Sequence, residues 1–447
     1  MIKKSLLIFS SALFCCGISS AITPNQLLSR GLKAYTSDGE NSYITDGTLT
    51  GWKRCTSKEI ALNVGSGAEK LLVTWESCGD YAWATDFTTG CTHSGTPLKN
   101  FTIKTSANST NGFDGDWESV ATIENNPVMA RGIFIDFQGQ SWVKIISEEE
   151  VGEILEIEVF DMTQGGDDTW FFMGTSISQM GMKQQDTDTT TADLIHARFP
   201  NFTPAMLRGG IGCINSSEVV ARLSDYLKYA GNVKYWAIEM GTNDAWGGGD
   251  WNLNTFKNNM QTIIDSAKSN GIEPILARII ATDETKAGWQ VNEKFLQVID
   301  ELTESNKLHK GPDFYNYFLA HPELIASDGV HPNGETGGGQ AMHHLWAEAL
   351  SPLYMQSEGD GTQNREVQNA LKTPIPKFYI QDKRMKITGL EGESTSIDIY
   401  NAAGCLMEHQ QTSSTSFEKE LTVPNGTYIV VVKTARCSFS TKLIIAD

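Results

Sequence analysis

Clusters of basic residues and long apolar runs are both missing from this 447-residue chain. The 35 lysines and arginines face 54 aspartates and glutamates, which gives a formal net charge of −19. A nucleic acid or an anionic membrane binds through a basic surface, so neither is expected as a partner. After the N-terminus, no apolar run approaches the ~18 residues of a membrane-spanning helix. We therefore expect no transmembrane segment in the mature chain.

Metal-binding cysteine patterns are missing as well. The eight cysteines form no CxxC pair and no cluster with histidine at zinc spacing, and we expect neither a metal nor an organic cofactor. Six of them lie after the N-terminal segment: Cys55, Cys78, Cys91, Cys213, Cys405 and Cys437. Cys78 and Cys91 are close enough in sequence to pair, and so are the last two, although spacing alone does not settle connectivity. Cys55 and Cys213 are then left as candidate free thiols.

The first 21 residues have the pattern of a secretory signal peptide. Lys3 and Lys4 precede an apolar stretch over residues 6–17, and Ser19-Ser20-Ala21 is a small-residue cleavage site. Export would permit disulfides in the mature chain. A lipid attachment at Cys15-Cys16 is the alternative, which the preceding phenylalanine disfavours.

Residues 22–163 alternate short apolar runs with Gly, Ser, Asn and Asp. The candidate strands are residues 70–75, 101–105, 132–137, 142–146 and 154–160. Such short strands with turn signals between them are typical of an all-β sandwich.

Residues 164–355 change to an alternation of strands and helices. The candidate buried strands are residues 169–173, 234–240 and 273–280. The candidate helices, with apolar residues three and four apart, are residues 217–230, 254–269, 290–308 and 336–349. This alternation predicts a parallel sheet covered by helices, whose active site would lie beyond the carboxyl ends of the strands.

The C-terminal part returns to short strands. Residues 356–374 are polar without periodicity and are interpreted as a linker. Residues 375–447 are predicted to form a small β-sandwich. Its candidate strands are residues 385–387, 395–400, 416–421, 427–434 and 440–446.

A serine follows the first strand of the α/β region. In Gly174-Thr175-Ser176-Ile177, the glycine two residues before the serine lets the serine present its hydroxyl with little steric cover. A turn or a helix cap would use the same residues.

An aspartate and a histidine stand three residues apart near the end of this region, in Ser327-Asp328-Gly329-Val330-His331-Pro332. A carboxylate can fix the tautomer of an imidazole, and the imidazole can take a proton from a serine. Serine is a weak nucleophile without such a base. Asp328 and His331 are therefore a candidate pair for activating a serine, although a surface turn with an incidental histidine would have the same pattern.

Two further loops could stabilise an oxyanion. Asn243 follows the second strand in Gly241-Thr242-Asn243-Asp244, where its amide could donate a hydrogen bond worth roughly 10²–10³ in rate. The glycine-rich segment 208–213 can bring backbone N–H groups close to a ligand. Each loop alone is equally typical of an ordinary turn.

Together, in this order, the four motifs resemble the four blocks of the SGNH hydrolases, also called GDSL-like esterases. The resemblance covers about residues 168–352, and its first block has GTSI in place of GDSL. It implies a flavodoxin-like α/β/α fold, with Ser176 as nucleophile and Asp328 and His331 completing the triad. It also implies an oxyanion hole from the Ser176 N–H, the Asn243 side chain and a second-block N–H. That last donor is assigned to Gly212, with Cys213 as the alternative.

Both flanking regions resemble known modules. Residues 98–108, 116–123 and 142–146 make residues 22–163 similar to discoidin-type galactose-binding-like modules, which bind sugars, hold calcium or brace a neighbouring catalytic domain. Residues 387–407, 424–434 and 440–447 make the C-terminus similar to type IX secretion sorting domains, although an adhesion module is the alternative. The candidate sugar-stacking residues of the first module are aromatic, a residue type more often found in cores: Trp52, Trp75, Tyr81 and Trp83.

The sequence thus predicts a secreted serine esterase that removes acetyl groups from an O-acetylated polysaccharide, with acetylxylan as the favoured substrate and the type IX machinery as its export partner. A lipase, a lysophospholipase or an esterase of bacterial glycans is the first alternative. A non-catalytic carbohydrate-binding protein is the second. Three tryptophans lie near the third motif: Trp236, Trp246 and Trp251. They suit a ring-binding rim better than an acyl groove, with Trp236 expected in the core.

Overall fold

The computed structural model divides the chain into two compact units, residues 1–357 and 358–447. In the first unit it describes residues 21–49, 55–77, 98–148, 154–182, 189–229 and 232–357. In the second it describes residues 358–360, 377–381, 384–388, 390, 395–401, 406–433 and 438–445. The predicted signal peptide, apart from its last residue, and most of the predicted linker lie outside these ranges, as do Cys78, Cys91, Cys405 and Cys437.

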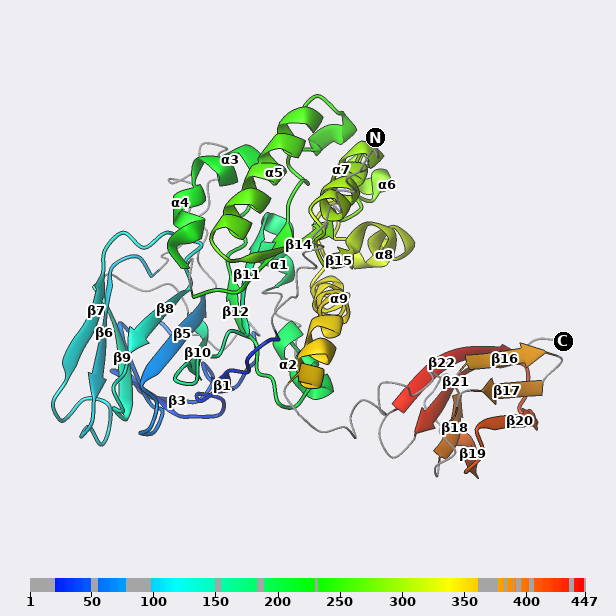
Figure 1. The fold of residues 1–447 in the computed structure, drawn as a ribbon, viewed down its shortest axis with the longest axis horizontal. Coiled ribbons are helices and arrows are strands. Elements are labelled where there is room, and N and C mark those ends of the chain that lie inside the picture. The colour runs from blue at the N-terminus through cyan, green and yellow to red at the C-terminus, as the bar shows by residue number, and fades with distance from the viewer. Residues whose placement is uncertain are drawn as a thin grey trace, which may run out of the picture. The chain divides into compact units, whose positions relative to one another are not determined.

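The N-terminal region of the first unit contains two antiparallel sheets, with strand orders β1-β10-β5-β8 and β3-β2-β4-β9-β6-β7 (Figure 1). The strands are β1 Gln26–Leu27, β2 Ala34–Thr36, β3 Gly39–Asn41, β4 Glu59–Asn63, β5 Lys70–Ser77, β6 Phe101–Ser106, β7 Glu118–Ile123, β8 Gly132–Asp136, β9 Trp142–Ser147 and β10 Ile154–Asp161. Alternate apolar residues of both sheets meet in one core, which includes Val73, Ile103 and Val143. All five predicted strands of this region are present.

Trp75 belongs to that core, and the prediction that it could stack on a sugar was wrong. Its side chain is 4% exposed and packs edge-on against Phe101, with ring centroids 5.4 Å apart. Trp75 lies at a strand position whose side chain points between the two sheets. Its ring is therefore packed in the core, where a sugar cannot reach it. The other candidates, Trp52, Tyr81 and Trp83, lie outside the described residues.

A five-stranded parallel sheet forms the centre of the first unit, in the order β12-β11-β13-β14-β15. The strands are β11 Thr169–Gly174, β12 Ala205–Arg208, β13 Tyr235–Glu239, β14 Glu273–Arg278 and β15 Lys310–Asp313. Counted along the chain, this order is 2-1-3-4-5, that of flavodoxin-like doubly wound sheets. The direction of winding reverses between β11 and β13, so the loops after these two strands diverge and leave space for a ligand.

Helices cover both faces of this sheet. They are α1 Ser176–Gly181, α2 Thr191–Arg198, α3 Ser216–Ala221, α4 Leu223–Tyr226, α5 Leu253–Ser269, α6 Glu284–Ala287, α7 Glu293–Ser305, α8 Phe314–Ala320 and α9 Gly338–Asp360. Adjacent residues of β11 point to opposite faces: Phe171 contacts Tyr226 of α4, and Phe172 contacts Trp346 of α9. Two-sided burial explains why the strands are apolar runs without alternation.

Two predicted boundaries differ from the structure. The single helix expected over residues 217–230 is divided at Arg222, whose backbone leaves helical geometry at φ −113° and ψ 21°. Helix α9 continues to Asp360, into the segment interpreted as a linker. Tyr354 explains part of that extension, because its ring is fully buried and its hydroxyl donates to Asp168 at 2.7 Å.

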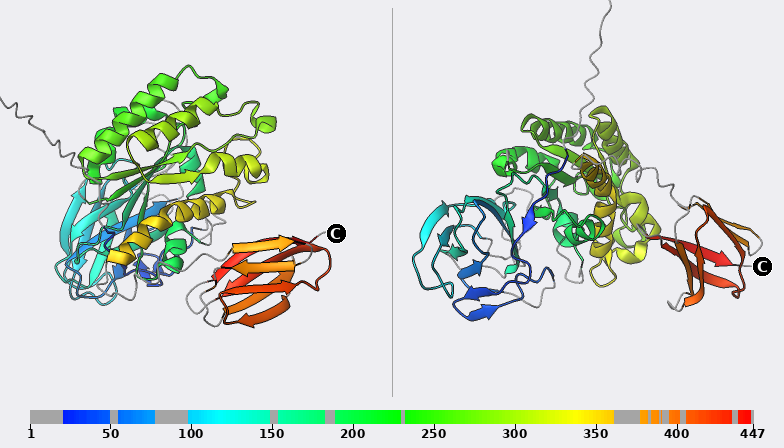
Figure 2. Two further views of the ribbon diagram at one scale, coloured as in Figure 1. Left: turned by 45° about the vertical axis from the view of Figure 1, so that its right-hand side comes forward. Right: turned by 60° about the horizontal axis from the view of Figure 1, so that its bottom comes forward.

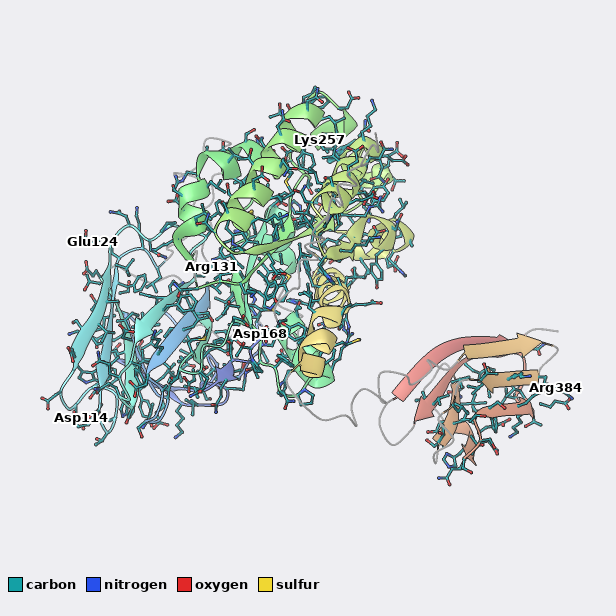
Figure 3. All side chains as sticks on the ribbon, in the orientation of Figure 1. Asp114, Glu124, Arg131, Asp168, Lys257 and Arg384 are labelled. Carbon is teal, nitrogen blue, oxygen red and sulfur yellow. The ribbon has the colours of Figure 1, made fainter. Side chains whose placement is uncertain are left out.

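The N-terminal sheets are joined to the parallel sheet by buried polar contacts. Glu76 of β5 pairs with Arg131 at 3.2 Å and lies 4.0 Å from Arg208 of β12. The Asn25 side chain donates to the carbonyl of Asp168 at 2.6 Å. Figure 3 labels Arg131 and Asp168. These contacts make the N-terminal region part of one compact unit with the parallel sheet.

The second unit contains two antiparallel sheets of its own, β16-β17-β20 and β19-β18-β21-β22 (Figure 2). The strands are β16 Lys377–Gln381, β17 Arg384–Thr388, β18 Thr395–Asn401, β19 Leu406–Thr412, β20 Ser416–Glu420, β21 Gly426–Lys433 and β22 Ser438–Ile445. A separate apolar core includes Ile387, Ile397 and Val430. Among the described residues of the whole chain, no helix combines the length and the apolar character needed to cross a membrane.

Candidate active site

The nucleophile candidate stands on the tight connection between β11 and α1. Thr175 caps α1 by accepting a hydrogen bond from the Ile177 N–H at 3.2 Å, and Ser176 is the first residue of the helix. Gly174 is required at the preceding position, because a Cβ atom there would lie 2.2 Å from the Ser178 hydroxyl. The connection therefore holds Ser176 in place at the carboxyl end of the sheet.

The three predicted triad residues come together in the structure. The Nε2 atom of His331 lies 2.8 Å from the Ser176 Oγ. Its Nδ1 atom lies 2.7 Å from the Asp328 Oδ2. Both distances are those of hydrogen bonds, and the chain Ser–His–Asp has the connectivity needed for a serine nucleophile with a histidine base. The structure thus brings Ser176 and His331 together although 155 positions separate them in the chain.

The loop that carries the histidine is closed at its base. An antiparallel bridge joins Ile325 to Pro332, and the Ala326 N–H donates to the His331 carbonyl at 2.8 Å. The Asp328 Oδ1 atom accepts the backbone N–H groups of Val330 at 2.9 Å and of His331 at 3.0 Å. One carboxylate therefore orders the turn with one oxygen and orients the imidazole with the other.

These hydrogen bonds also set the charge of Asp328. Partial burial acts to raise the pKa of this carboxyl, but the hydrogen bonds from Val330 and His331 outweigh it and lower the pKa below its ordinary value. The group is therefore ionised at neutral pH. An ionised carboxylate can stabilise the imidazolium that forms when His331 takes a proton.

Two of the predicted oxyanion donors have suitable local geometry. The Ser176 N–H is at the first position of α1, where backbone N–H groups have no partner within the helix. The Asn243 side chain is half-buried and donates one N–H to the Ile214 carbonyl at 2.7 Å. A primary amide has two N–H groups, so one is oriented by Ile214 while the other remains able to donate to a ligand. The assignment of Gly212 rather than Cys213 as the third donor stays a prediction.

The glycine-rich second motif packs directly against the nucleophile helix. The Ile211 N–H donates to the Gly174 carbonyl at 2.9 Å. A Cβ atom on Gly210 would lie 2.5 Å from the backbone nitrogen of Gln179 in α1. The close backbone approach explains the need for glycine here, and it fixes the loop relative to Ser176.

Cys213 is disulfide-bonded, so the prediction of a free thiol was wrong for this residue. The prediction is confirmed for Cys55, which is free and buried. Disulfide pairing depends on proximity in the fold, and spacing along the chain gave no information on Cys213. Its backbone has φ +63°, a left-handed conformation uncommon for a side chain other than glycine or asparagine. The disulfide is thus formed by the last residue of the glycine-rich segment 208–213, at a position with a left-handed backbone.

Glu239, the last residue of β13, lies behind the nucleophile and was not singled out from the sequence. It is 0% exposed, and its Oε2 atom accepts three hydrogen bonds. The donors are the Thr175 N–H at 3.3 Å, the Thr175 hydroxyl at 3.1 Å and the Ser178 hydroxyl at 3.2 Å. Burial raises the pKa of Glu239 to about 7, against the lowering effect of these hydrogen bonds. The sequence did carry one signal for this residue, because Glu239 is the only charged residue in the run YWAIEM.

Asp244, in the third motif, has a supporting role. It is 4% exposed and accepts hydrogen bonds from both the N–H and the hydroxyl of Ser216, at 3.1 and 2.5 Å. Burial raises its pKa despite these bonds. Asp244 therefore joins the loop that carries Asn243 to the start of α3, just beyond the glycine-rich loop. In the described parts of the chain, no group of three or more His, Cys, Asp or Glu side chains is placed to hold a metal ion.

Comparisons with known proteins find resemblance among solved structures. The chain is similar to the lipase/acylhydrolase from Enterococcus faecalis, with 17% identity, 41% of this chain and 95% of that chain covered, and a TM-score of 0.33. It is similar to the acetylxylan esterase Axe2 from Geobacillus stearothermophilus, with 17% identity, 43% and 94% covered, and a TM-score of 0.32. It is also similar to TesA, with 21% identity and a TM-score of 0.34; the match covers 41% of this chain and 99% of TesA.

No protein-family model matches the chain, and no curated protein sequence does. At identities of 17–21% and TM-scores of 0.32–0.34, none of the structural likenesses assigns an activity to this chain. The chemistry of the site rests on its own geometry.

Proposed function

We propose that this protein is a secreted serine esterase that removes acetyl groups from an O-acetylated polysaccharide, with acetylxylan as the favoured substrate. The observation that carries the proposal is the hydrogen-bonded chain from Ser176 through His331 to Asp328, at 2.8 and 2.7 Å. A serine with a base and an orienting carboxylate is suited to acyl transfer.

The reaction takes two steps. The Ser176 Oγ attacks the acetyl carbonyl while its proton moves to the Nε2 of His331, and the negative charge on the carbonyl oxygen is met by the Ser176 N–H and the Asn243 amide. The ester bond then breaks, and His331 returns the proton to the sugar oxygen, which leaves as a hydroxyl. Water attacks the acetyl-serine with His331 again as base, acetate leaves, and Ser176 regains its proton.

The polysaccharide part of the proposal has weaker, separate support. Exposed tryptophans follow Asn243 in the chain, and Trp246 is 49% exposed. Export by the predicted signal peptide and by type IX recognition of residues 375–447 belongs to the same proposal. The separate C-terminal unit, with its own core, supports a sorting module.

The test is acetate release from acetylated xylan by the wild type and by Ser176→Ala. Release that disappears in the variant is the expected result. Hydrolysis of 4-nitrophenyl acetate that depends on Ser176, without release from xylan, would keep the esterase and overturn the substrate. An equal rate for wild type and variant on both compounds would overturn the esterase.

A further inference from the structure

Three tryptophans in the segments that follow β13 and β14 have no part in the acyl-transfer chemistry. They are Trp246, Trp251 and Trp289, here called the tryptophan platform. The indole of Trp251 is 67% exposed and that of Trp246 is 49% exposed, whereas Trp289 is half-buried. The rings of Trp246 and Trp289 contact each other at a centroid distance of 5.2 Å, tilted by 51°. Large aromatic faces are thus held open to solvent at one place.

The platform is attached to the catalytic residues through two loops at the carboxyl ends of the strands. Trp246 follows Asn243 by three residues, so their Cα atoms are at most about 11 Å apart. Trp289 belongs to the loop after β14, in which the Asp283 N–H donates to the Gly329 carbonyl at 2.8 Å. Gly329 lies between Asp328 and His331 in the triad loop. The platform therefore spans the segments that carry the oxyanion donor and the base.

The platform is also ordered without a ligand. The Asn292 side chain donates to the Gly248 carbonyl at 3.2 Å and ties the two loops together. The Thr282 hydroxyl donates to the Trp289 carbonyl at 2.7 Å. The Trp251 ring lies against bare glycine backbone, since a Cβ on Gly249 would be 1.5 Å from it. A surface held in this way loses little conformational entropy when it binds.

An exposed pair of charged groups accompanies one of these rings. Asp250 directly precedes Trp251 and forms an exposed ion pair with Lys294 at 2.5 Å. A pyranose ring has an apolar C–H face that can stack on an indole and hydroxyls on its edge that can bond such groups. A saturated acyl chain has no groups that could use them.

We propose that the tryptophan platform binds a sugar ring of the polysaccharide next to the acetylated residue, so that the enzyme acts on polymers or oligosaccharides. This proposal rests on the proposed esterase function and specifies its substrate class. It differs from lipid recognition in that the ligand supplies hydroxyl groups as well as an apolar face.

The experiment uses the full chain with Trp246→Ala and Trp251→Ala, two exposed positions whose replacement does not open a core. Acetylated xylan is the polymeric substrate and 4-nitrophenyl acetate the small one. We expect each variant to lower kcat/KM on xylan about tenfold more than on the aryl acetate, mainly through KM, as for the loss of one stacked contact. Tyr43→Ala, a matched control at 49% exposure outside the catalytic region, should leave both activities unchanged.

A binding measurement separates this proposal from the esterase itself. Ser176→Ala is titrated with xylohexaose and with cellohexaose, and we expect at least one to bind and Trp246→Ala to weaken that binding. Binding of neither, with Ser176-dependent hydrolysis of the aryl acetate intact, overturns the platform and leaves the esterase. A selective loss of 4-nitrophenyl octanoate hydrolysis in Trp246→Ala, with oligosaccharide binding unaltered, would assign the platform to acyl chains and overturn the proposal.

Discussion

The free energy of unfolding of the wild type should fall as the pH rises because Glu239 is buried, and replacing Glu239 with glutamine should remove that fall. Burial raises the pKa of this carboxyl from 4.5 to about 7 in the folded protein, in spite of the hydrogen bonds from Thr175 and Ser178. The folded state therefore favours the neutral acid. The stabilising contribution of that preference is complete below pH 4.5 and is lost as the pH rises towards 7. The difference between the two pKa values corresponds to about 3 kcal/mol.

The assay is urea unfolding of wild type and Glu239→Gln at pH 4.5 and pH 8, followed by tryptophan fluorescence. All eleven tryptophans lie between residues 52 and 346, so the signal reports the first unit alone. Between the two pH values, the free energy of unfolding of the wild type should fall relative to the variant by about 3 kcal/mol. Other buried acids with raised pKa values, such as Asp168 and Glu156, are present in both proteins and cancel.

A relative change below about 1 kcal/mol would refute this reasoning, because Glu239 would then ionise in the fold at little cost. Glu124→Gln removes one carboxylate from an exposed position, which Figure 3 labels, and serves as the control for net charge. A change of the same size in that control would mean that overall charge, and not burial of Glu239, causes the effect.

Three further variants test the site. Asp328→Asn removes the charge that supports the imidazolium and should lower kcat by about 10³–10⁴ with little change in KM, measured on 4-nitrophenyl acetate; a loss under tenfold would contradict an orienting role. Asn243→Ala should lower kcat by about 10²–10³ with substrate binding retained, as expected for an oxyanion donor; an effect on KM alone would oppose that role. Cys213→Ser removes a disulfide and should lower the free energy of unfolding by about 2–4 kcal/mol in urea; an unchanged midpoint would show that the disulfide is unimportant for stability.

The residues of the candidate triad could be picked out from the sequence because each of them stands in a local motif. Ser176 follows a buried strand by two residues, and Asp328 and His331 share one short turn. Parallel strands end at the same edge of a sheet, so residues that follow them meet even when they are far apart in the chain. Asn243 was predicted for the same reason.

The two short strands of the central sheet were not predicted. Ala205–Arg208 and Lys310–Asp313 each have four residues, and the second, KGPD, has neither an apolar run nor alternation. They become strands because a neighbour in the sheet pairs with them, β11 for the first and β14 for the second. Pairing partners far along the chain carry no local signal.

Glu239 shows why a buried charge can be visible in a sequence and still resist interpretation. A glutamate within an apolar strand costs stability by itself, and only the fold reveals that Thr175 and Ser178 lie within hydrogen-bonding distance of it. Its Oε2 atom takes up the donors on either side of Ser176, which holds the nucleophile turn in one geometry.

The cost of burying Glu239 is therefore connected to catalysis. Glutamine at this position retains an acceptor for Thr175 and Ser178, so kcat should remain within about threefold of the wild type, because the turn keeps its geometry. Alanine leaves both donors buried without an acceptor, and a displaced nucleophile can cost about 10²-fold in rate. If kcat on 4-nitrophenyl acetate fell equally in the two variants, the charge itself would be needed for the reaction. A larger fall in the alanine variant would mean that Glu239 acts by positioning, and that the protein accepts a less stable strand in order to fix Ser176.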